Sequence, residues 1–375
     1  MDGRMSFGFP RMHREVGERR DFLPTFVASL TRLGCDVVVE RGIGSAMGFS
    51  DLDYVAAGAR VASEDEAFRQ DVVVILRAPS QLDRVRPGAT LVSMLHLATR
   101  PERVRELCDR GIDAISLDTI EDDDGTRLVV NGRAVAWNGV EAAFDALAVT
   151  WPALERPGRR PVRVLVMGAG DIGKHAVEAA TKYGSLARAA RLAARGVDGV
   201  EVLTIGRNLT SCERYLWARM EDVDVLVDAT QRDDPSRPLI HNDLIARLPS
   251  HAVICDLVVD PYLLDDVPPT VRGIEGIPQG NLDRYVLAVD DPAWDDVPDG
   301  IPTRSRRTVV SCYSWPGLHP RACMELYGRQ LGPLLETLAR RGGIGRVRPD
   351  GSFAERALWR GSLHAWLGRD ALVVA

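Results

Sequence analysis

The stretch Val162-Arg163-Val164-Leu165-Val166-Met167, which runs into Gly168-Ala169-Gly170-Asp171-Ile172-Gly173, decides the fold of this 375-residue chain. Its apolar half is typical of a buried β-strand, and its glycine-rich half is typical of a tight turn before a helix. Gly168 permits the bend, Gly170 lets backbone amides approach a diphosphate, and Gly173 lets the helix pack closely on the strand. The sequence therefore predicts a dinucleotide-binding strand, turn and helix.

The helix expected from Asp171 onward supplies the second half of this site. Its first N–H groups have no partner within the helix, and together with the helix dipole they favour bound phosphate. The alternative is a glycine-rich turn of an α/β domain that binds nothing. The predicted cofactor-binding residues of the turn are Gly168, Gly170, Asp171, Ile172 and Gly173.

Length and composition indicate an ordinary globular protein of two domains, since domains usually have about 100–200 residues. Hydrophobic residues make up 45% and charged residues 27% of the chain, and the net charge is −6. This balance gives no reason to expect a nucleic acid or an anionic membrane as partner. No apolar run is long enough to span a membrane, and the N-terminus lacks the apolar core of a signal peptide. Six scattered cysteines suggest free thiols and no metal site, so we expect a cytoplasmic protein.

Strand-like and helix-like segments alternate along the chain, which predicts an α/β fold with parallel sheets. In the first region, strands are expected at 36–40, 71–76, 90–94 and 112–117, with helices at 22–33 and after Pro101. In the second region, strands are expected at 162–167, 200–205, 223–228 and 252–257, after a polar linker at 156–161. A helix at 322–340 is expected to return to the first region. The predicted domains are therefore residues 1–137 with 316–375, and residues 138–315.

The strand after the glycine turn indicates which cofactor binds. Such a strand normally ends in an acidic residue that binds the ribose hydroxyls of NAD. Here residues 200–205 are followed by Gly206-Arg207-Asn208, and a guanidinium suits a ribose 2′-phosphate. The sequence therefore favours NADP(H) over NAD(H), the alternative being that Arg207 is a solvent-exposed loop residue. Two further residues, Ala229 and Thr230, follow the next strand and are assigned to the same site.

One spacing departs from the usual pattern. Arg207 lies 207 − 173 = 34 residues after Gly173, where about 20 is usual. The excess falls in residues 184–199, which contain apolar residues at helical spacing. We interpret this segment as an inserted or extended helix.

The ordered set of motifs resembles the superfamily of alanine dehydrogenase and the transhydrogenase α subunit. That superfamily includes saccharopine dehydrogenase and N5-(carboxyethyl)ornithine synthase. The resemblance implies two Rossmann-like domains with parallel sheets and a cleft between them, the first domain being completed by the C-terminal helices. It rests on the following segments: Phe7-Gly8-Phe9-Pro10, Glu18-Arg19-Arg20-Asp21-Phe22-Leu23-Pro24, Val39-Glu40-Arg41-Gly42-Ile43-Gly44, Phe49-Ser50-Asp51, Tyr54-Val55-Ala56-Ala57-Gly58-Ala59, Arg77-Ala78-Pro79, Leu95-His96-Leu97-Ala98, Asp256-Leu257-Val258-Val259-Asp260 and Pro316-Gly317.

The resemblance also implies three functional side chains. Arg19 matches an arginine that binds the substrate carboxylate, a pairing that suits the two-pronged guanidinium. His96 matches an active-site histidine at a strand end, where an imidazole can exchange a proton near neutral pH. Asp260 matches an aspartate that orients water or the substrate amine. The alternatives are a charged surface turn for Arg19, a structural histidine for His96, and a turn or helix-capping acid for Asp260.

Two positions depart from the family pattern. The lysine expected before Ala78-Pro79 is Arg77, which can hold a carboxylate or a carbonyl oxygen but does not readily release its proton. The asparagine expected before Pro316-Gly317 is Trp315, which we expect to reshape the pocket near the nicotinamide. Both changes argue against alanine itself as the substrate.

The sequence thus predicts an NADP(H)-dependent oxidoreductase that acts on a C–N bond of an amino acid. The reaction would be a reductive amination or its reverse, or an opine-type reduction of an imine between a 2-oxo acid and an amino acid such as ornithine or lysine. Catalysis is assigned to His96, Asp260 and Arg77, and substrate binding to Arg19 and Arg77. The alternative is a non-catalytic or regulatory NADP(H)-binding protein. The family resemblance implies a homo-oligomer.

Overall fold

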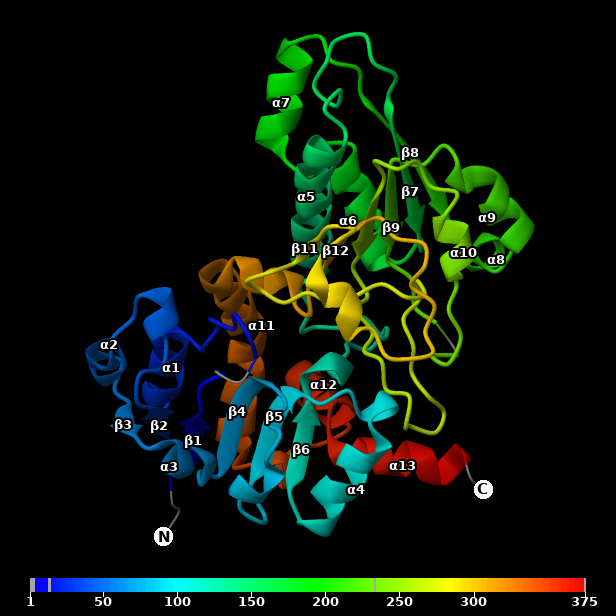
Figure 1. Cartoon of the computed structure of the whole chain (residues 1–375). Helices are drawn as coiled ribbons and strands as arrows, with labels where there is room; N and C mark the ends of the chain where they lie inside the picture. The colour runs from blue at the N-terminus through cyan, green and yellow to red at the C-terminus, as the bar shows by residue number, and fades with distance from the viewer. Residues whose placement is uncertain (1–3, 13–14, 233, 374–375) are drawn as a thin grey trace. The chain divides into compact units, whose positions relative to one another are not determined.

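The computed structural model describes residues 4–12, 15–232 and 234–373 and divides into two compact units (Figure 1). Unit 1 comprises Met1–Asn131 and His319–Ala375, and unit 2 comprises Gly132–Leu318. The sequence had suggested boundaries at 137/138 and 315/316. Helix α5 (Gly132–Thr150) runs unbroken across the first of these positions, so residues 132–137 group with unit 2.

Unit 1 is built on a sheet of six parallel strands in the order β3-β2-β1-β4-β5-β6. This is the strand order of the doubly wound fold, in which the chain changes direction between the first and fourth strands and ligands bind outside the carboxyl ends there. The strands are β1 (Ser6–Phe9), β2 (Asp36–Glu40), β3 (Arg60–Ala62), β4 (Val72–Arg77), β5 (Thr90–Met94) and β6 (Asp113–Ser116).

The helices of unit 1 come from both ends of the chain and share one core with the sheet. Leu331 and Leu335 of the C-terminal helix α11 are buried in the same apolar cluster as Val73 of β4 and Leu91 of β5. The expectation that the C-terminal helices complete the first domain is confirmed. The helices are α1 (Pro24–Thr31), α2 (Asp51–Ala56), α3 (Glu64–Phe68), α4 (Pro101–Asp109), α11 (Pro320–Arg341), α12 (Phe353–Arg360) and α13 (Leu363–Val373).

Unit 2 is built on a second six-stranded sheet, in the order β11-β12-β10-β9-β7-β8. All pairs are parallel except β11 with β12, which is antiparallel. Because β8 and β9 lie on opposite sides of β7, the direction of the fold changes at β7. The strands are β7 (Val162–Met167), β8 (Val200–Ile205), β9 (Val225–Asp228), β10 (Val253–Asp256), β11 (Val286–Leu287) and β12 (Thr308–Ser311).

Alternate residues of β7 face two separate cores, as expected for a strand covered on both faces. Val164 and Val166 join the core that α5 and α6 cover, whereas Leu165 and Met167 join the core that α9 and α10 cover. Figure 1 shows these helix pairs on opposite faces of the sheet. The helices after α5 are α6 (Asp171–Ala180), α7 (Leu186–Ala194), α8 (Arg207–Thr210), α9 (Glu213–Met220) and α10 (Asn242–Ile245).

Most of the predicted elements are present. The strands at 36–40, 90–94, 162–167 and 200–205 are confirmed at their predicted bounds, and the inserted helix is α7. The sequence analysis missed β1, β3, β11 and β12, which have two to four residues each and too little pattern to stand out. Among the described residues, no helix is long and apolar enough to cross a membrane.

The shared core of unit 1 can be tested at Leu331, which is fully buried. Leu331→Ala should lower the free energy of unfolding by about 2–5 kcal/mol, because a cavity remains where the side chain packed. The control is Leu52→Ala on helix α2, where the side chain is 76% exposed, and it should change stability by less than about 0.5 kcal/mol. Urea denaturation of the full chain measures both. Equal effects of the two variants would show that α11 does not belong to this core.

Candidate active site

Two glycines of the turn after β7 are required by close backbone contacts. Gly168 has φ +103°, and a Cβ there would lie 2.3 Å from the carbonyl oxygen of Ala229. A Cβ on Gly173 would lie 2.0 Å from the carbonyl oxygen of Gly168. Real Cβ atoms do not approach backbone this closely, so any other residue at either position would displace the turn. The roles expected of these two glycines agree with the packing.

Gly170 differs because a Cβ there would meet no atom within 4 Å. It is the N-cap of α6, a helix of 10 residues whose first turn contains Asp171 and the buried Gly173. A helix start has backbone N–H groups without partners inside the helix, and it carries a partial positive charge. Open space in front of such a helix start fits a diphosphate group.

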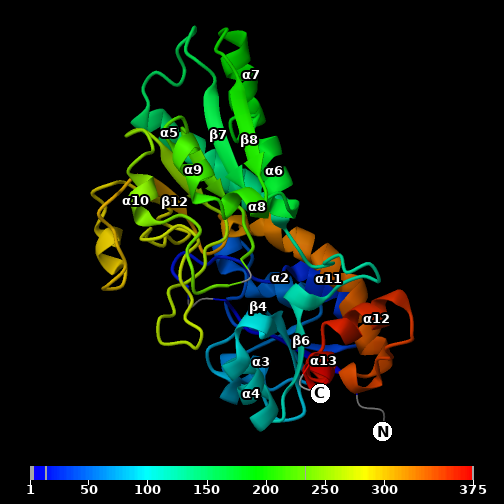
Figure 2. The same ribbon diagram turned by 90° about the vertical axis from the view of Figure 1, so that its right-hand side faces the viewer.

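The remaining predicted cofactor residues flank this turn. Met167 pairs with Ile205 of β8 on one side and with Asp228 of β9 on the other, and Figure 2 shows β7 and β8 side by side. The residues after these strands therefore lie on either side of Gly168, whose N–H donates to the carbonyl of Ile205. Six predicted residues meet here: Gly168, Gly206, Arg207, Asn208, Ala229 and Thr230. Arg207 is exposed and begins α8, so the inserted helix α7 does not displace it from the strand end.

Asp228, at the end of β9, is a buried acid that the sequence analysis did not single out. Its Oδ1 accepts hydrogen bonds from the backbone N–H of Thr230 at 3.0 Å and from the Thr230 hydroxyl at 2.6 Å. Burial raises the pKa of Asp228 to about 7, and the negative charge of Asp256 on the next strand adds to this rise. Asp228 thus fixes the loop at Thr230 while carrying a proton that an exposed aspartate would have lost.

In unit 1, Arg77 lies where β4 ends, next to β1, at the point where the strand order reverses. Its Nη2 is 3.2 Å from Oε1 of Glu15, in the loop that follows β1. Both side chains are partly exposed, and ligands of doubly wound sheets bind at this kind of position. Arg77 is thus a partly exposed cation at this strand end, and its neighbour Glu15 was not identified by the sequence analysis.

His96 lies two residues beyond β5, in a left-handed backbone conformation (φ +51°) that non-glycine residues seldom adopt. Its Nδ1 is 3.5 Å from Oδ2 of Asp118, and its backbone N–H donates to Oδ1 of the same carboxylate at 3.1 Å. The His96 side chain is 58% exposed, whereas that of Asp118 is 12% exposed. The mostly buried carboxylate of Asp118 therefore contacts Nδ1 of the His96 imidazole, which is otherwise accessible to solvent.

Burial opposes ionisation of Asp118, but hydrogen bonds from His96 and Ser116, together with the charge of His96, lower the pKa of Asp118 well below its usual range. The Ser116 hydroxyl donates to Oδ1 at 2.7 Å. Asp118 is thus an ionised carboxylate that holds the imidazole of His96 from one side. Sequence reasoning missed it, although it follows the strand that pairs with β5 (Ser93 with Ser116), so both carboxyl ends meet at one edge.

Arg19 and Arg20 are neighbours with different surroundings. Arg20 is 3% exposed and binds Glu18 with two hydrogen bonds, from Nε at 2.8 Å and from Nη2 at 2.6 Å. This buried pair fixes the loop before α1. Arg19 is exposed, so of the two arginines it is the one that solvent reaches.

Asp260, in unit 2, follows β10 by a short turn. Its Oδ2 lies 2.6 Å from Nη2 of Arg232, and its side chain is 33% exposed against 4% for Arg232. Asp260 therefore has a specific ionic partner, which the sequence alone did not reveal. Val259, directly before it, has φ +56°.

The structure contradicts the expectation that Trp315 reshapes a ligand pocket. Its side chain is 1% exposed and packs in the core of unit 2, edge-on against Tyr285. The indole N–H donates to the carbonyl of Asp256 at 2.8 Å, and Asn138 donates to the carbonyl of Trp315. An indole with a buried hydrogen-bond partner is a core residue. Trp315 therefore supports the end of β10 instead of lining a pocket.

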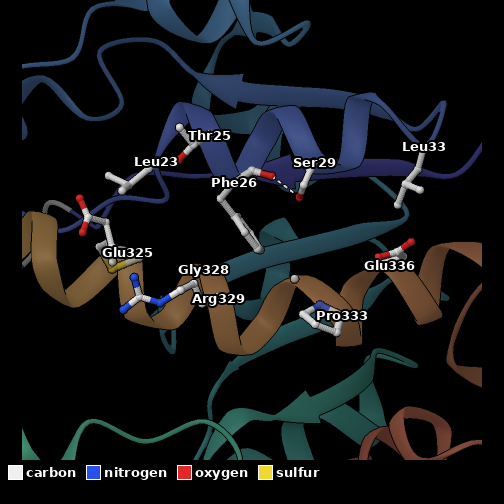
Figure 3. A pocket seen from close by; sticks show the side chains of 12 residues that line it. Leu23, Thr25, Phe26, Ser29, Leu33, Glu325, Gly328, Arg329, Pro333 and Glu336 are labelled. Atoms are coloured by element: carbon white, nitrogen blue, oxygen red, sulfur yellow. Dashed lines mark hydrogen bonds between the residues drawn. The ribbon is translucent and has the colours of Figure 1, made fainter.

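A groove of about 430 Å³ lies between α1 and α11 of unit 1 (Figure 3). Phe26 of α1 faces Gly328 of α11, and the ends of the groove carry Glu325 and Glu336. None of the predicted site residues is among the described residues that line it. Among the described residues, no three His, Cys, Asp or Glu side chains are grouped to hold a metal ion.

Comparisons with known proteins agree with the resemblance read from the sequence. Residues 11–132 match the family described as "Alanine dehydrogenase/PNT, N-terminal domain". The chain is 26% identical to an alanine dehydrogenase of Halomonas elongata over 272 residues, which are 68% of this chain and 73% of the relative. It is 29% identical to NAD(P) transhydrogenase subunit alpha of Haemophilus influenzae over 197 residues, which are 49% of this chain and 38% of the relative.

Among solved structures, an L-alanine dehydrogenase has the same fold, with a TM-score of 0.65 and 22% identity. The match covers 96% of this chain and 94% of that one. The predicted resemblance and the α/β fold class, with two sheets of mainly parallel strands, are confirmed.

The buried Asp228 predicts a pH dependence of stability. Between the ordinary aspartate pKa of about 3.9 and its folded pKa of about 7, the folded chain binds a proton that the unfolded chain has lost. In that window the free energy of unfolding should fall as pH rises, by up to about 1.4 kcal/mol per pH unit. Asp228→Asn has no proton to lose and should lack this slope. Urea denaturation of both proteins at several pH values measures the difference, and parallel curves would refute the raised pKa.

Proposed function

We propose that this chain, a homologue of alanine dehydrogenases and transhydrogenase α subunits, is a nicotinamide-dependent oxidoreductase that acts on a C–N bond of an amino acid. The observation that carries the proposal is the turn at Gly168–Gly173. Backbone atoms leave no room for a Cβ on Gly168 or Gly173, whereas Gly170 faces open space at a helix start. The open space at the helix start supports the binding of a dinucleotide phosphate group there.

NADP(H) is the proposed cofactor. Two positions at the end of β8 support this choice: Gly206 is the N-cap of α8, and Arg207, its first residue, is exposed beside the glycine turn. The strand end offers no acidic side chain that would bind the two ribose hydroxyls of NAD. A guanidinium can donate several hydrogen bonds to a 2′-phosphate.

NADP(H), when bound, supplies or accepts the hydride. In the proposed reaction, Arg19 and Arg77 bind the substrate carboxylate through charge-assisted hydrogen bonds. His96 takes up or releases the proton of the attacking or departing group, while Asp118 holds its imidazole by Nδ1 and leaves Nε2 for the substrate. Asp260, held by Arg232, accepts a hydrogen bond from the amine or from water. Arg77 contributes charge, because arginine does not readily lose its proton.

The substrate class has two versions. In the simpler one, ammonia and a 2-oxo acid form an imine that is reduced to an amino acid. In the opine-type version, the amine of an amino acid such as ornithine or lysine takes the place of ammonia. The presence of arginine at position 77, instead of lysine, favours a substrate with more than one carboxylate. We further propose that the chain works in the cytoplasm as a homo-oligomer.

A substrate screen tests this function and separates the two versions. The full chain would be incubated with NADPH or NADH, with pyruvate or 2-oxoglutarate, and with ammonia, ornithine or lysine, while the nucleotide absorbance is followed. Turnover with ornithine or lysine but not ammonia would support the opine-type reaction. Turnover with ammonia alone would exclude it. Nucleotide binding without turnover on any pair would instead support a non-catalytic NADP(H)-binding protein, which the loss of the lysine at position 77 favours.

The cofactor assignment predicts the behaviour of Arg207→Ala. Loss of a charged hydrogen-bond donor should weaken NADPH binding about tenfold or more. NADH binding should change little, because NADH has no 2′-phosphate. Fluorescence titration with each nucleotide measures both constants. An equal loss for NADPH and NADH would show that Arg207 does not recognise the 2′-phosphate.

The proton-transfer role predicts the behaviour of His96→Ala. The variant should lose about 100-fold or more in kcat, since a positioned acid–base group usually contributes that much. Its affinity for NADPH should stay as in the native chain, because the nucleotide residues lie in unit 2. Steady-state kinetics and NADPH titration check the two parts. An unchanged kcat would remove His96 from the mechanism.

A further inference from the structure

The turn that carries Asp260 is strained and has its own internal support. Val259 is a β-branched residue at φ +56°, a strained conformation that persists only where the surrounding contacts impose it. Oδ1 of Asp256, at the end of β10, accepts hydrogen bonds from the backbone N–H groups of Val258 and Val259 at 3.1 and 2.9 Å. The turn is therefore bent around one carboxylate.

The carboxylate of Asp256 is itself held by two buried side chains. Oδ2 of Asp256 accepts from Nη1 of Arg272 at 2.6 Å and from the hydroxyl of Ser311 at 3.0 Å. Arg272 is 1% exposed and belongs to the long connection between β10 and β12, and Ser311 ends β12. The backbone of the Asp260 turn is thus held by a buried network at the carboxyl ends of two strands.

The side chain of Asp260 is held by a second arginine. Nη2 of Arg232 donates to Oδ2 of Asp260 at 2.6 Å and also to the carbonyl of Val271. Nη1 of the same guanidinium donates to the carbonyls of Arg237 at 2.7 Å and Pro235 at 3.3 Å. Arg232 therefore joins three segments: its own loop after β9, the turn after β10, and the connection that contains Arg272.

The pair is asymmetric in its exposure. Arg232 is 4% exposed, whereas Asp260 is 33% exposed, so the arginine is the inner member and the acid faces outward. The Nε of Arg232 is buried and has no hydrogen-bond partner in the described part of the chain. A buried guanidinium is costly unless it is paired with a negative charge. The carboxylate of Asp260 is therefore the partner that offsets the cost of burying Arg232.

We propose that Arg232 is a positioning residue for Asp260. The inference rests on the proposed function, in which Asp260 faces the amine or the water. Arg232 holds Oδ2 and so fixes the orientation of the carboxylate, which leaves Oδ1 as a hydrogen-bond acceptor. Asp260 then orients the amine or water, and proton transfer falls to His96. This role is specific to Arg232, because the nearby buried Arg272 contacts Asp256, the acid that holds the backbone of the turn.

A double-mutant cycle tests the role in turnover. Arg232→Met should lower kcat by about 100-fold, since a small misplacement of a positioned group has effects of that size. NADPH affinity should be unchanged, and Arg232→Lys should recover much of the loss. In an Asp260→Asn chain, Arg232→Met should lower kcat no further, because Arg232 acts only through Asp260. Full additivity of the two changes would overturn the proposal.

Hydrogen exchange gives a second readout that does not depend on the reaction. In Arg232→Met, exchange should speed up in the peptide covering residues 257–263 and stay unchanged in unit 1. Arg160→Met is the matched control: Arg160 binds the buried Asp224 at 2.6 Å before β9, at the opposite end of the same sheet. It should leave both kcat and exchange at 257–263 unchanged.

The outcomes distinguish a failure of the positioning role of Arg232 from a failure of the proposed function. Unchanged exchange at 257–263 in Arg232→Met, or equal effects of Arg160→Met there, would overturn the proposal. If the native chain turns over no substrate but Arg232→Met still speeds exchange at 257–263, the proposed function fails while the Arg232–Asp260 contact stands. If Arg232→Met does not fold, Arg232→Lys is measured in both the native and the Asp260→Asn chains. Equal losses in those two backgrounds would count against the proposal.

Discussion

The carbonyl oxygen of Gly168 lies 2.0 Å from the place where a Cβ of Gly173 would stand, and this approach fixes the first turn of helix α6 against strand β7. The same turn places Gly168 against the loop at Ala229, which follows the neighbouring strand β9. Because both contacts involve backbone atoms, they fix the path of the turn. In that path, Gly170 faces open space. The candidate cofactor site is a consequence of this packing.

Both units place their candidate active-site side chains by one rule. Parallel strands bring their carboxyl ends to a common edge, so residues distant in sequence meet there. In unit 1 the rule brings His96 to Asp118, and in unit 2 it brings Asp260 to Arg232. In each pair the more buried member holds the more exposed one. The arrangement explains how short, strained segments at His96 and Val259 keep a defined geometry.

Sequence reasoning succeeded where a local pattern has one physical meaning. The glycine turn, the strand at 200–205 and the inserted helix were predicted from apolar periodicity and glycine spacing, and Arg207 was placed in the Gly206-Arg207-Asn208 segment that follows the strand. Sequence reasoning failed for residues whose role depends on their contacts in the folded structure. Nothing local distinguishes Asp118 from other acids or Arg232 from the chain's other arginines, and Trp315 was expected near a ligand because only the fold shows that it is a core residue.

The most direct test of the central claim is a calorimetric titration of the full chain with NADPH, comparing the native protein with Gly170→Val. Gly170 has an extended backbone and no atom near a Cβ, so valine should leave the melting temperature unchanged. The side chain would nevertheless occupy the space proposed for the diphosphate. We expect binding by the native chain and none by the variant. Equal binding by both proteins, or no binding of either nucleotide by the native chain, would contradict the account.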